Sequence, residues 1–268
     1  MTWCAGNPNA QVKPMALLWS YEEDGNRYEV RSAGASLRLY RNGVHHSQWN
    51  PDRPLSGSVW DLITLPALHR PPASLQDGLM LGFGAGAVAR QLCDLAGLKR
   101  LVGVEWDPMH LSIAQGFFEC PAACQLVAAD AVEWVYDAGT EPVFDLIIDD
   151  LYGEEAGLPV RCAPLDVEWF SRLVQLLRPG GMLVLNTIEP DQIRYLPLFT
   201  HAALKLRLLH RIMYQIDGYE NRVLAFSDRS FCSKQLHAAL RAICRRYPRC
   251  YGVSQRYQLS SADDSGDF

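Results

Sequence analysis

The sequence predicts an α/β fold, in which a mostly parallel sheet of seven strands is covered by helices and is preceded by a small N-terminal antiparallel sheet. Three observations lead to this prediction. From residue 78 onward, short apolar runs alternate with helical patterns, which is typical of a parallel sheet buried on both faces. Residues 16–48 instead alternate with period two between turns. The run 78–107 places a glycine-rich turn between a strand and a helix, which makes the large unit Rossmann-like.

Length and composition fit a globular protein. The 268 residues leave room for one large domain and a smaller appendage, and 49% hydrophobic with 21% charged residues is typical of a chain with a core. The net charge of −5 gives no general attraction to nucleic acid or to an anionic membrane. No apolar run reaches the roughly 20 residues of a membrane span. We therefore expect a small-molecule substrate and neither a nucleic-acid nor a membrane partner.

The ends of the chain and the cysteines give further expectations. The N-terminal residues lack the basic start and apolar block of a signal peptide, and the eight cysteines show no disulfide or zinc-ribbon spacing. Both features predict a cytoplasmic protein. We divide the chain into a flexible leader (1–15), a small β-sheet region (16–55), a Rossmann-like nucleotide-binding domain (56–250) and a mostly disordered tail (251–268).

The small sheet and the helix after it are predicted from turn and cap signals. The runs LLWSYE, RYEVRSA and SLRLYRNGV are joined by turn sequences at 24–26 and 42–43, which indicates β-hairpins. The next run, SGSVWDLITLPALHRPP, has the pattern of a helix that begins at Ser56 or Ser58 and ends before Pro71.

The large sheet is predicted from five apolar runs, at 78–82, 100–105, 124–128, 144–149 and 181–187. After a helix near 191–204 come two more β-like runs, 205–215 and 221–227, joined at Asp217-Gly218. This joint is too short for a parallel crossover, so the pair must be an antiparallel hairpin. A last helix is expected at about 230–247.

The glycine turn predicts a nucleotide site. Gly82, Gly84 and Gly86 follow the first strand of the large unit, where the lack of a Cβ lets a backbone approach a ligand closely. Glu105 ends the second strand and can accept hydrogen bonds from both hydroxyls of a ribose. The turn alone also fits a loose NAD fingerprint.

Two further features favour an adenosyl ligand over NAD. Asp130 ends the third strand, ahead of Ala131, and can accept a hydrogen bond from an adenine amino group, an acid that NAD folds do not require. Five parallel strands followed by a hairpin is also the strand plan of class I AdoMet-dependent methyltransferases. We therefore expect S-adenosyl-L-methionine or decarboxylated S-adenosylmethionine as the cofactor, with an NAD-dependent oxidoreductase as a less favoured alternative.

The end of the fourth strand carries the candidate reaction chemistry. Asp149 and Asp150 end this strand beside the expected ligand, and Tyr152 follows in the next loop. Asp150 is our candidate catalytic residue, orienting an amine and accepting its proton. Asp149 and Tyr152 are expected on the substrate side, although neighbouring side chains of a strand point to opposite faces, so one carboxylate would face the pocket. No metal is expected.

The sequence resembles the spermidine synthase family, the polyamine aminopropyltransferases, over residues 37–227. The glycine turn is matched by LGFGAGA, the ribose acid by GVEWD and the adenine side by Asp130-Ala131. FDLIIDDLYG resembles the segment with the family's catalytic aspartate, which falls at Asp150. The resemblance implies a class I methyltransferase fold, an adenosyl cofactor and a homodimer formed through the small sheet.

The sequence departs from that family on the side that binds the amine. Ala85 stands where the family has an aspartate for the amino end of the donor, and Gly153 where it has a second aspartate. Val59-Trp60-Asp61 replaces a Tyr-His-Glu stretch. A polyamine needs several carboxylates at its ammonium groups, so these changes weaken the amine pocket and leave the adenosyl pocket intact.

The predicted function is therefore a spermidine-synthase-like transferase. It would use AdoMet, or a decarboxylated or thioether relative, and move an alkyl group to a small amine nucleophile, with methyl favoured over aminopropyl. A genuine polyamine aminopropyltransferase and a non-catalytic protein that binds an adenosyl ligand are the alternatives.

Overall fold

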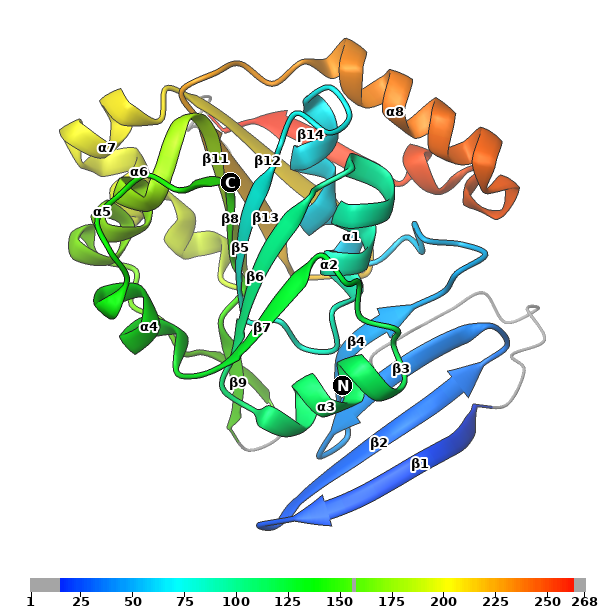
Figure 1. The fold of residues 1–268 in the computed structure, drawn as a ribbon. Coiled ribbons are helices and arrows are strands. Elements are labelled where there is room, and N and C mark those ends of the chain that lie inside the picture. Colours follow the sequence, from blue (N-terminus) through cyan, green and yellow to red (C-terminus); the bar gives the residue numbers. More distant parts are fainter. Residues whose placement is uncertain (1–14, 156–157, 263–268) are drawn as a thin grey trace.

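The computed structural model describes residues 15–155 and 158–262. Its main body is a large sheet with helices on both faces, and a small sheet lies beside one end of it (Figure 1). Of the predicted leader, all but Met15 lies outside the described residues. No helix in the described ranges is long and apolar enough to cross a membrane.

The large sheet confirms the predicted α/β fold and has one strand more than expected. Its order is β14-β12-β13-β11-β8-β5-β6-β7. The strands are β5 (Asp77–Leu81), β6 (Arg100–Glu105), β7 (Cys124–Ala128), β8 (Phe144–Asp149), β11 (Leu177–Thr187), β12 (His210–Ile216), β13 (Arg222–Ser227) and β14 (Tyr257–Ser261). The first five are mutually parallel, and β13 and β12 form the predicted antiparallel hairpin at one side.

Helices cover both faces of this sheet. The α-helices are α1 (Val59–Thr64), α2 (Ala87–Gln91), α3 (Pro108–Gly116), α4 (Ala131–Asp137), α5 (Val167–Leu176), α6 (Pro197–Thr200), α7 (Ala202–Arg207) and α8 (Ser233–Arg246). Short 3-10 or π turns complete them: η1 (Leu65–His69), η2 (Leu92–Ala96), η3 (Pro190–Tyr195), η4 (Pro248–Cys250) and η5 (Val253–Gln255). Figure 1 shows α4 to α7 on one face and α1, α2 and α8 on the other.

The apolar strands explain this layering. In β8, Ile147 packs into the cluster of the α4–α7 face and Ile148 into that of the α1–α2–α8 face, and both are fully buried. A parallel strand covered on both faces needs apolar residues at successive positions, which is why the centre of β8, residues 146–148, is a continuous apolar run.

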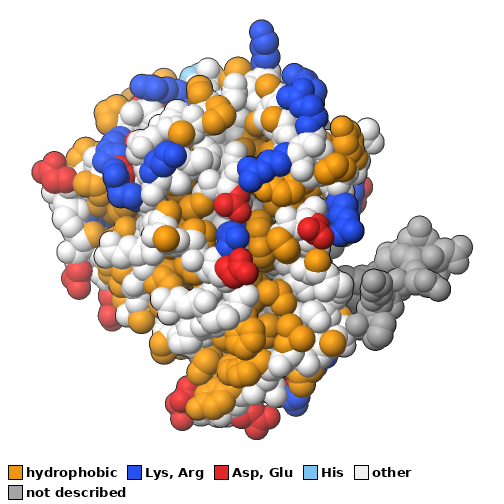
Figure 2. All heavy atoms as spheres, turned by 45° about the vertical axis from the view of Figure 1, so that its right-hand side comes forward, with side chains coloured by type: hydrophobic (Ala, Val, Ile, Leu, Met, Phe, Trp, Pro, Cys, Tyr) orange, Lys and Arg blue, Asp and Glu red, His pale blue; other side chains and the backbone are white. Residues whose placement is uncertain are grey.

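The small sheet consists of β1 (Ala16–Glu23), β2 (Asn26–Ala33), β3 (Ser36–Arg41) and β4 (Val44–Trp49), in that order. It shares the core of the large unit, because Val30 and Leu39 belong to the same buried cluster as Phe83. Its outer strand β1 is exposed, with Leu17 and Leu18 about half accessible. Figure 2 shows hydrophobic side chains gathered towards the lower end of the molecule in that view.

The expectation of a mostly disordered tail was wrong for its first part. Residues 257–261 form β14, which pairs antiparallel with β12. The physical reason is that β12 would otherwise be an open sheet edge, and Tyr257 finds a buried partner when its hydroxyl donates to Asp61. Residues 263–268 lie outside the described part of the chain.

A second difference lies directly after β8, where we expected a loop. The chain forms a two-stranded hairpin of β9 (Tyr152–Glu155) and β10 (Leu158–Arg161), with Tyr152 opposite Arg161. This hairpin folds over the end of β8 that carries Asp149 and Asp150.

Candidate active site

The glycine turn connects β5 to α2 with a backbone that other residues rarely adopt. Gly82, Gly84 and Gly86 have φ of +84°, +55° and +78°. A Cβ at Gly82 would overlap the carbonyl oxygen of Asp150, and one at Gly84 would lie 3.3 Å from the carbonyl oxygen of His46. Gly82 is therefore required for close approach of the protein's own chain, a reason that differs from the ligand approach we expected.

The side chain of Phe83 packs against the glycine turn and holds it in place. Its ring is 2% exposed and fills the space in which a Cβ of Gly103 or Gly86 would lie. The turn is thus packed against β6, the strand that ends in Glu105.

Glu105 ties this strand to the turn. Its Oε2 accepts a hydrogen bond from the backbone N–H of Gly84 at 2.8 Å, and its Oε1 accepts one from the N–H of Asp107 at 3.1 Å. Burial acts to raise the pKa of Glu105, but the nearby His110 and the two backbone donors outweigh it and hold the pKa below its ordinary value. Glu105 is therefore an anion that can accept further hydrogen bonds.

Asp130 caps α4. Its Oδ1 accepts hydrogen bonds from the N–H groups of Val132 at 2.7 Å and Glu133 at 3.0 Å. Its Oδ2 has no hydrogen-bond partner within residues 15–155 and 158–262, and the side chain is exposed. Capping and ligand binding are therefore compatible at Asp130.

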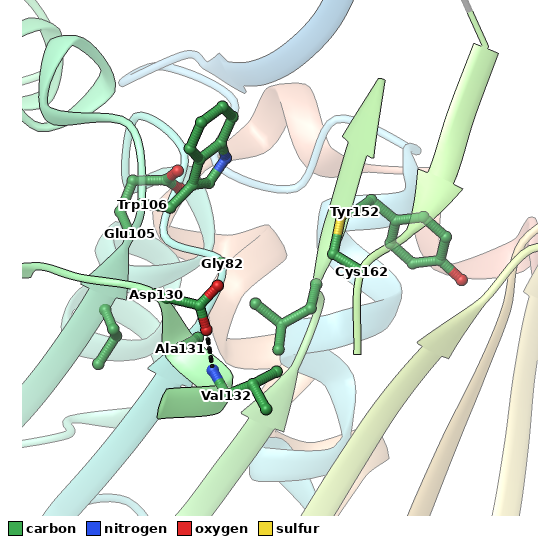
Figure 3. A pocket seen from close by; sticks show the side chains of 10 residues that line it. Gly82, Glu105, Trp106, Asp130, Ala131, Val132, Tyr152 and Cys162 are labelled. Atoms are coloured by element: carbon green, nitrogen blue, oxygen red, sulfur yellow. Dashed lines mark hydrogen bonds between the residues drawn. The ribbon is translucent and has the colours of Figure 1, made fainter. Parts of the chain in front are cut away.

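A small, open hollow of about 50 Å³ lies between these groups. It is lined by Gly82, Val104, Glu105, Trp106, Asp130, Ala131, Val132, Leu151, Tyr152 and Cys162. Figure 3 shows Glu105 and Trp106 on one side of the hollow and Tyr152 and Cys162 on the other, with Asp130 between them. It brings together five of the predicted site residues, whereas Gly84, Gly86, Asp149 and Asp150 do not line it.

Trp106 forms an exposed aromatic wall of the hollow. Its side chain is 56% accessible, and the guanidinium of Arg41 lies 5.1 Å from the ring centroid. A cation–π contact of this kind holds the indole in place although it is open to solvent.

The expectation that Asp149 lies on the substrate side was wrong. The side chain is fully buried, and its Oδ2 accepts hydrogen bonds from Arg161 at 2.6 Å and from the indole N–H of Trp169 at 2.9 Å. The alternation of side chains along β8 turns Asp149 towards α5, and a buried carboxylate there needs a cation as its partner.

Asp150 points to the opposite face. Its Oδ1 accepts a hydrogen bond from the amide of Asn186 at 2.8 Å, and its backbone N–H donates to Leu81 at 3.0 Å. Burial raises the pKa of Asp150 to about 7, and the charges of Asp149 and Glu105 act in the same direction. A carboxyl group with a pKa near neutrality can both accept and release a proton.

Tyr152 is held by the end of β11. Its hydroxyl donates to the carbonyl of Asn186 at 3.3 Å and accepts from the N–H of Ile188 at 3.2 Å. Arg161 lies 5.9 Å from the ring centroid. The hydroxyl is thus used within the protein, and Tyr152 borders the hollow without offering a free donor.

Several residues that shape the site were not found from the sequence. Arg161 forms an ion pair with Asp149, Trp169 donates a hydrogen bond to the same carboxylate, and Asn186 donates one to Asp150. No short-range pattern marks such partners. In the described part of the chain, no group of three His, Cys, Asp or Glu side chains is arranged to hold a metal ion.

Known proteins resemble this chain in sequence and in fold. No family model matches it. A polyamine aminopropyltransferase of Mycobacterium tuberculosis is 31% identical over 219 residues, which are 77% of this chain and 38% of that protein. The crystal structure of a probable spermidine synthase from Corynebacterium glutamicum matches with a TM-score of 0.70 at 20% identity and covers 91% of each chain. The chain is therefore similar over most of its length to proteins named polyamine aminopropyltransferase, and it shares the fold of a probable spermidine synthase.

Other similar proteins include methyltransferases. An eEF1A lysine and N-terminal methyltransferase homolog of Drosophila melanogaster is 25% identical over 151 residues, 54% of this chain and 21% of that protein. A spermidine synthase in complex with the transition-state analogue AdoDATO matches with a TM-score of 0.57 (12% identity, 82% and 76% covered). Human methyltransferase-like protein 13 in complex with SAH matches with 0.55 (19% identity, 73% and 96% covered). The chain thus spans well under half the length of these two curated relatives.

The departures from the spermidine synthase family can now be located. Ala85 is 1% exposed and packs into the core, so no charged group replaces the missing aspartate of the turn. Asp61 is fully buried and accepts hydrogen bonds from Gln91 and Tyr257, which makes it a structural residue.

Proposed function

We propose that this protein is a transferase that moves an alkyl group from the sulfonium of an adenosyl donor to a small amine. The observation that carries the proposal is the position of Asp150 at the end of β8, where its carbonyl oxygen packs against Gly82, which lines the hollow. The proposal places a donor site and a carboxylate of pKa about 7 next to each other.

The residues of the hollow fit an adenosyl donor. Glu105 is anionic and can accept ribose hydroxyls, and the free Oδ2 of Asp130 can accept an adenine amino group. Trp106 and Ala131 would flank the base. When bound, such a donor supplies an electrophilic carbon on a positively charged sulfur.

Asp150 would act on the acceptor. An ammonium group has no lone pair for attack, so it must first lose a proton, and Asp150 can take that proton near neutral pH. Asn186 keeps Oδ1 occupied, which leaves Oδ2 for the amine. Holding the nitrogen in line with the electrophilic carbon is then the main contribution of the site.

Two alkyl groups remain candidates, each favoured by a specific observation. Similarity to proteins named polyamine aminopropyltransferase and spermidine synthase favours aminopropyl transfer. The apolar, buried Ala85 and Gly153 in β9 favour methyl transfer, because neither supplies a carboxylate for an aminopropyl amine. Taken together, the similar proteins favour aminopropyl transfer over methyl transfer.

Ligand binding tests the proposal directly. We expect AdoMet or its decarboxylated form to raise the melting temperature, and NAD to have no effect; at 100 times the dissociation constant a ligand stabilises its protein by about 2.7 kcal/mol. A preference between the two donors would identify the alkyl group. Absence of any shift with AdoMet, decarboxylated AdoMet and methylthioadenosine would refute an adenosyl pocket.

An Asp150→Asn variant then tests turnover. We expect the donor to bind as before and the rate of transfer to the amine to fall by about 10²- to 10⁴-fold. Asp191→Asn, an exposed acid outside the site, is the matched control and should leave the rate unchanged. Binding of the donor without transfer to any amine, in the wild type, would instead favour the non-catalytic alternative.

A further inference from the structure

A chain of two amides leads from the terminal hairpin to Asp150. Asn221 lies just before β13, in the connection from β12, and its Nδ2 donates to Oδ1 of Asn186 at 3.1 Å. Asn186 lies near the end of β11, and its own Nδ2 donates to Oδ1 of Asp150 at 2.8 Å. The ends of three strands that are distant in sequence are thus linked by hydrogen bonds, directly or through Asn186, to one carboxylate.

The two amide hydrogen bonds run in one direction, from Asn221 through Asn186 to Asp150. A side-chain amide has its acceptor on one side and its donors on the other. Because Asn221 donates to the oxygen of Asn186, the NH₂ group of Asn186 is turned to Asp150. The reverse orientation would place the oxygen of Asn186 against an ionised carboxylate, which is repulsive.

The middle residue of the chain is held firmly. Asn186 is 5% exposed, its backbone pairs with Val223 of β13, and its carbonyl accepts the hydroxyl of Tyr152. A buried side chain on a central strand with both ends hydrogen-bonded has one arrangement available, so it can fix its neighbour.

We propose that Asn186 and Asn221 are positioning residues that orient Asp150, with Asn221 acting through Asn186. The proposal rests on the proposed function of Asp150 and gives the terminal hairpin a role in it: the hairpin fixes one carboxylate oxygen and leaves the other for the acceptor amine. Oδ2 of Asp150 has no hydrogen-bond partner among the residues that the structure describes.

The charged groups around Asp150 do not orient its carboxylate, so the orientation depends on the amides of Asn186 and Asn221. Asp149 and Glu105 are anions and disfavour ionisation of Asp150. Arg161 favours it, but its Nη2 is bound to Asp149 at 2.6 Å and makes no hydrogen bond to Asp150. Asn186 is therefore the one side-chain donor to Asp150 in the described part of the chain.

Titration of Asp150 tests the proposal without any turnover. The carboxyl carbon of Asp150, labelled with ¹³C and assigned by its loss in Asp150→Asn, reports its pKa by NMR. Loss of a hydrogen bond to the ionised form should raise that pKa by about one pH unit in Asn186→Leu. Asn221→Ala should raise it less, because Asn186 keeps its amide but is free to turn.

A matched control comes from the same hairpin. Gln215 of β12 donates to Gln258 at 2.6 Å in an exposed amide pair, so Gln215→Ala removes a similar contact away from Asp150 and should leave its pKa unchanged. Asn221 is only partly buried, so its variant should fold even if Asn186→Leu does not.

The outcomes separate the proposal from the function on which it rests. An Asp150 pKa that is the same in wild type, Asn221→Ala and Asn186→Leu overturns the positioning role, whatever the enzyme does. A raised pKa in a protein that transfers nothing would support the amide chain and refute the function. Where transfer is found, the acidic limb of its pH profile should move upward with the pKa in both variants.

Discussion

At the scale of single residues, the two glycines at 82 and 84 should respond differently to the same substitution. Both have positive φ, so Ala at either position costs about 1 kcal/mol of backbone strain. At Gly82 the new Cβ would also overlap the carbonyl of Asp150, while at Gly84 it has 3.3 Å to His46. We expect Gly82→Ala to lower the free energy of unfolding by about 3 kcal/mol or more, and Gly84→Ala by about 1 kcal/mol.

Urea denaturation of the two variants measures this difference. Equal losses would show that Asp150 does not pack against Gly82 as the structure has it. Because Gly82→Ala must also push Asp150 away from the turn, any transfer activity should fall further in this variant than in Gly84→Ala.

At the scale of elements, we expect β14 to stabilise the fold through the hydroxyl of Tyr257. Tyr257 donates to the fully buried Asp61 of α1 at 2.9 Å, so Tyr257→Phe keeps the ring and leaves a buried acceptor short of one donor. We expect a loss of about 1–3 kcal/mol in the free energy of unfolding. Tyr251→Phe, at a side chain that is 66% exposed, is the control and should change nothing measurable. A neutral Tyr257→Phe would mean that water or another group replaces the hydroxyl.

The elements that sequence predicts are those with local signals. The strands β5 to β8 each contain a short apolar run, α3 begins with Asp107 and Pro108, and the β12–β13 joint is too short for a crossover. The hairpin β9–β10 and the strand β14 have no such signals. The strand β14 pairs with the distant edge of β12, and the hairpin β9–β10 is held at the end of β8 by the contact of Arg161 with Asp149. A short sequence window around β14 does not contain its partner strand.

At the scale of the molecule, the same distinction applies to the site. Glu105, Asp130 and Asp150 were predicted because parallel strands bring their carboxyl ends to one edge, a consequence of topology alone. The partners were not, since the ion pair of Asp149 with Arg161 and the contact of Asn221 with Asn186 form only when hairpins fold back onto that edge.

Buried histidines should make the stability of the whole protein depend on pH. Burial lowers the pKa of His69, which is 1% exposed, from 6.5 to about 4, and that of His46 to about 3. Between these values and 6.5 the unfolded chain binds protons that the folded protein does not, so stability falls as the pH falls.

For His69 alone the loss between pH 7 and pH 5 should be about 2 kcal/mol. Urea denaturation at pH 7, 6 and 5 measures the slope. His69→Gln should reduce this slope by the share of His69, because the glutamine binds no proton in either state, while His46 keeps its own contribution. His201→Gln, at an exposed histidine, should keep the wild-type slope. A stability that is constant from pH 7 to pH 5 would show that these imidazoles are not held neutral inside the fold.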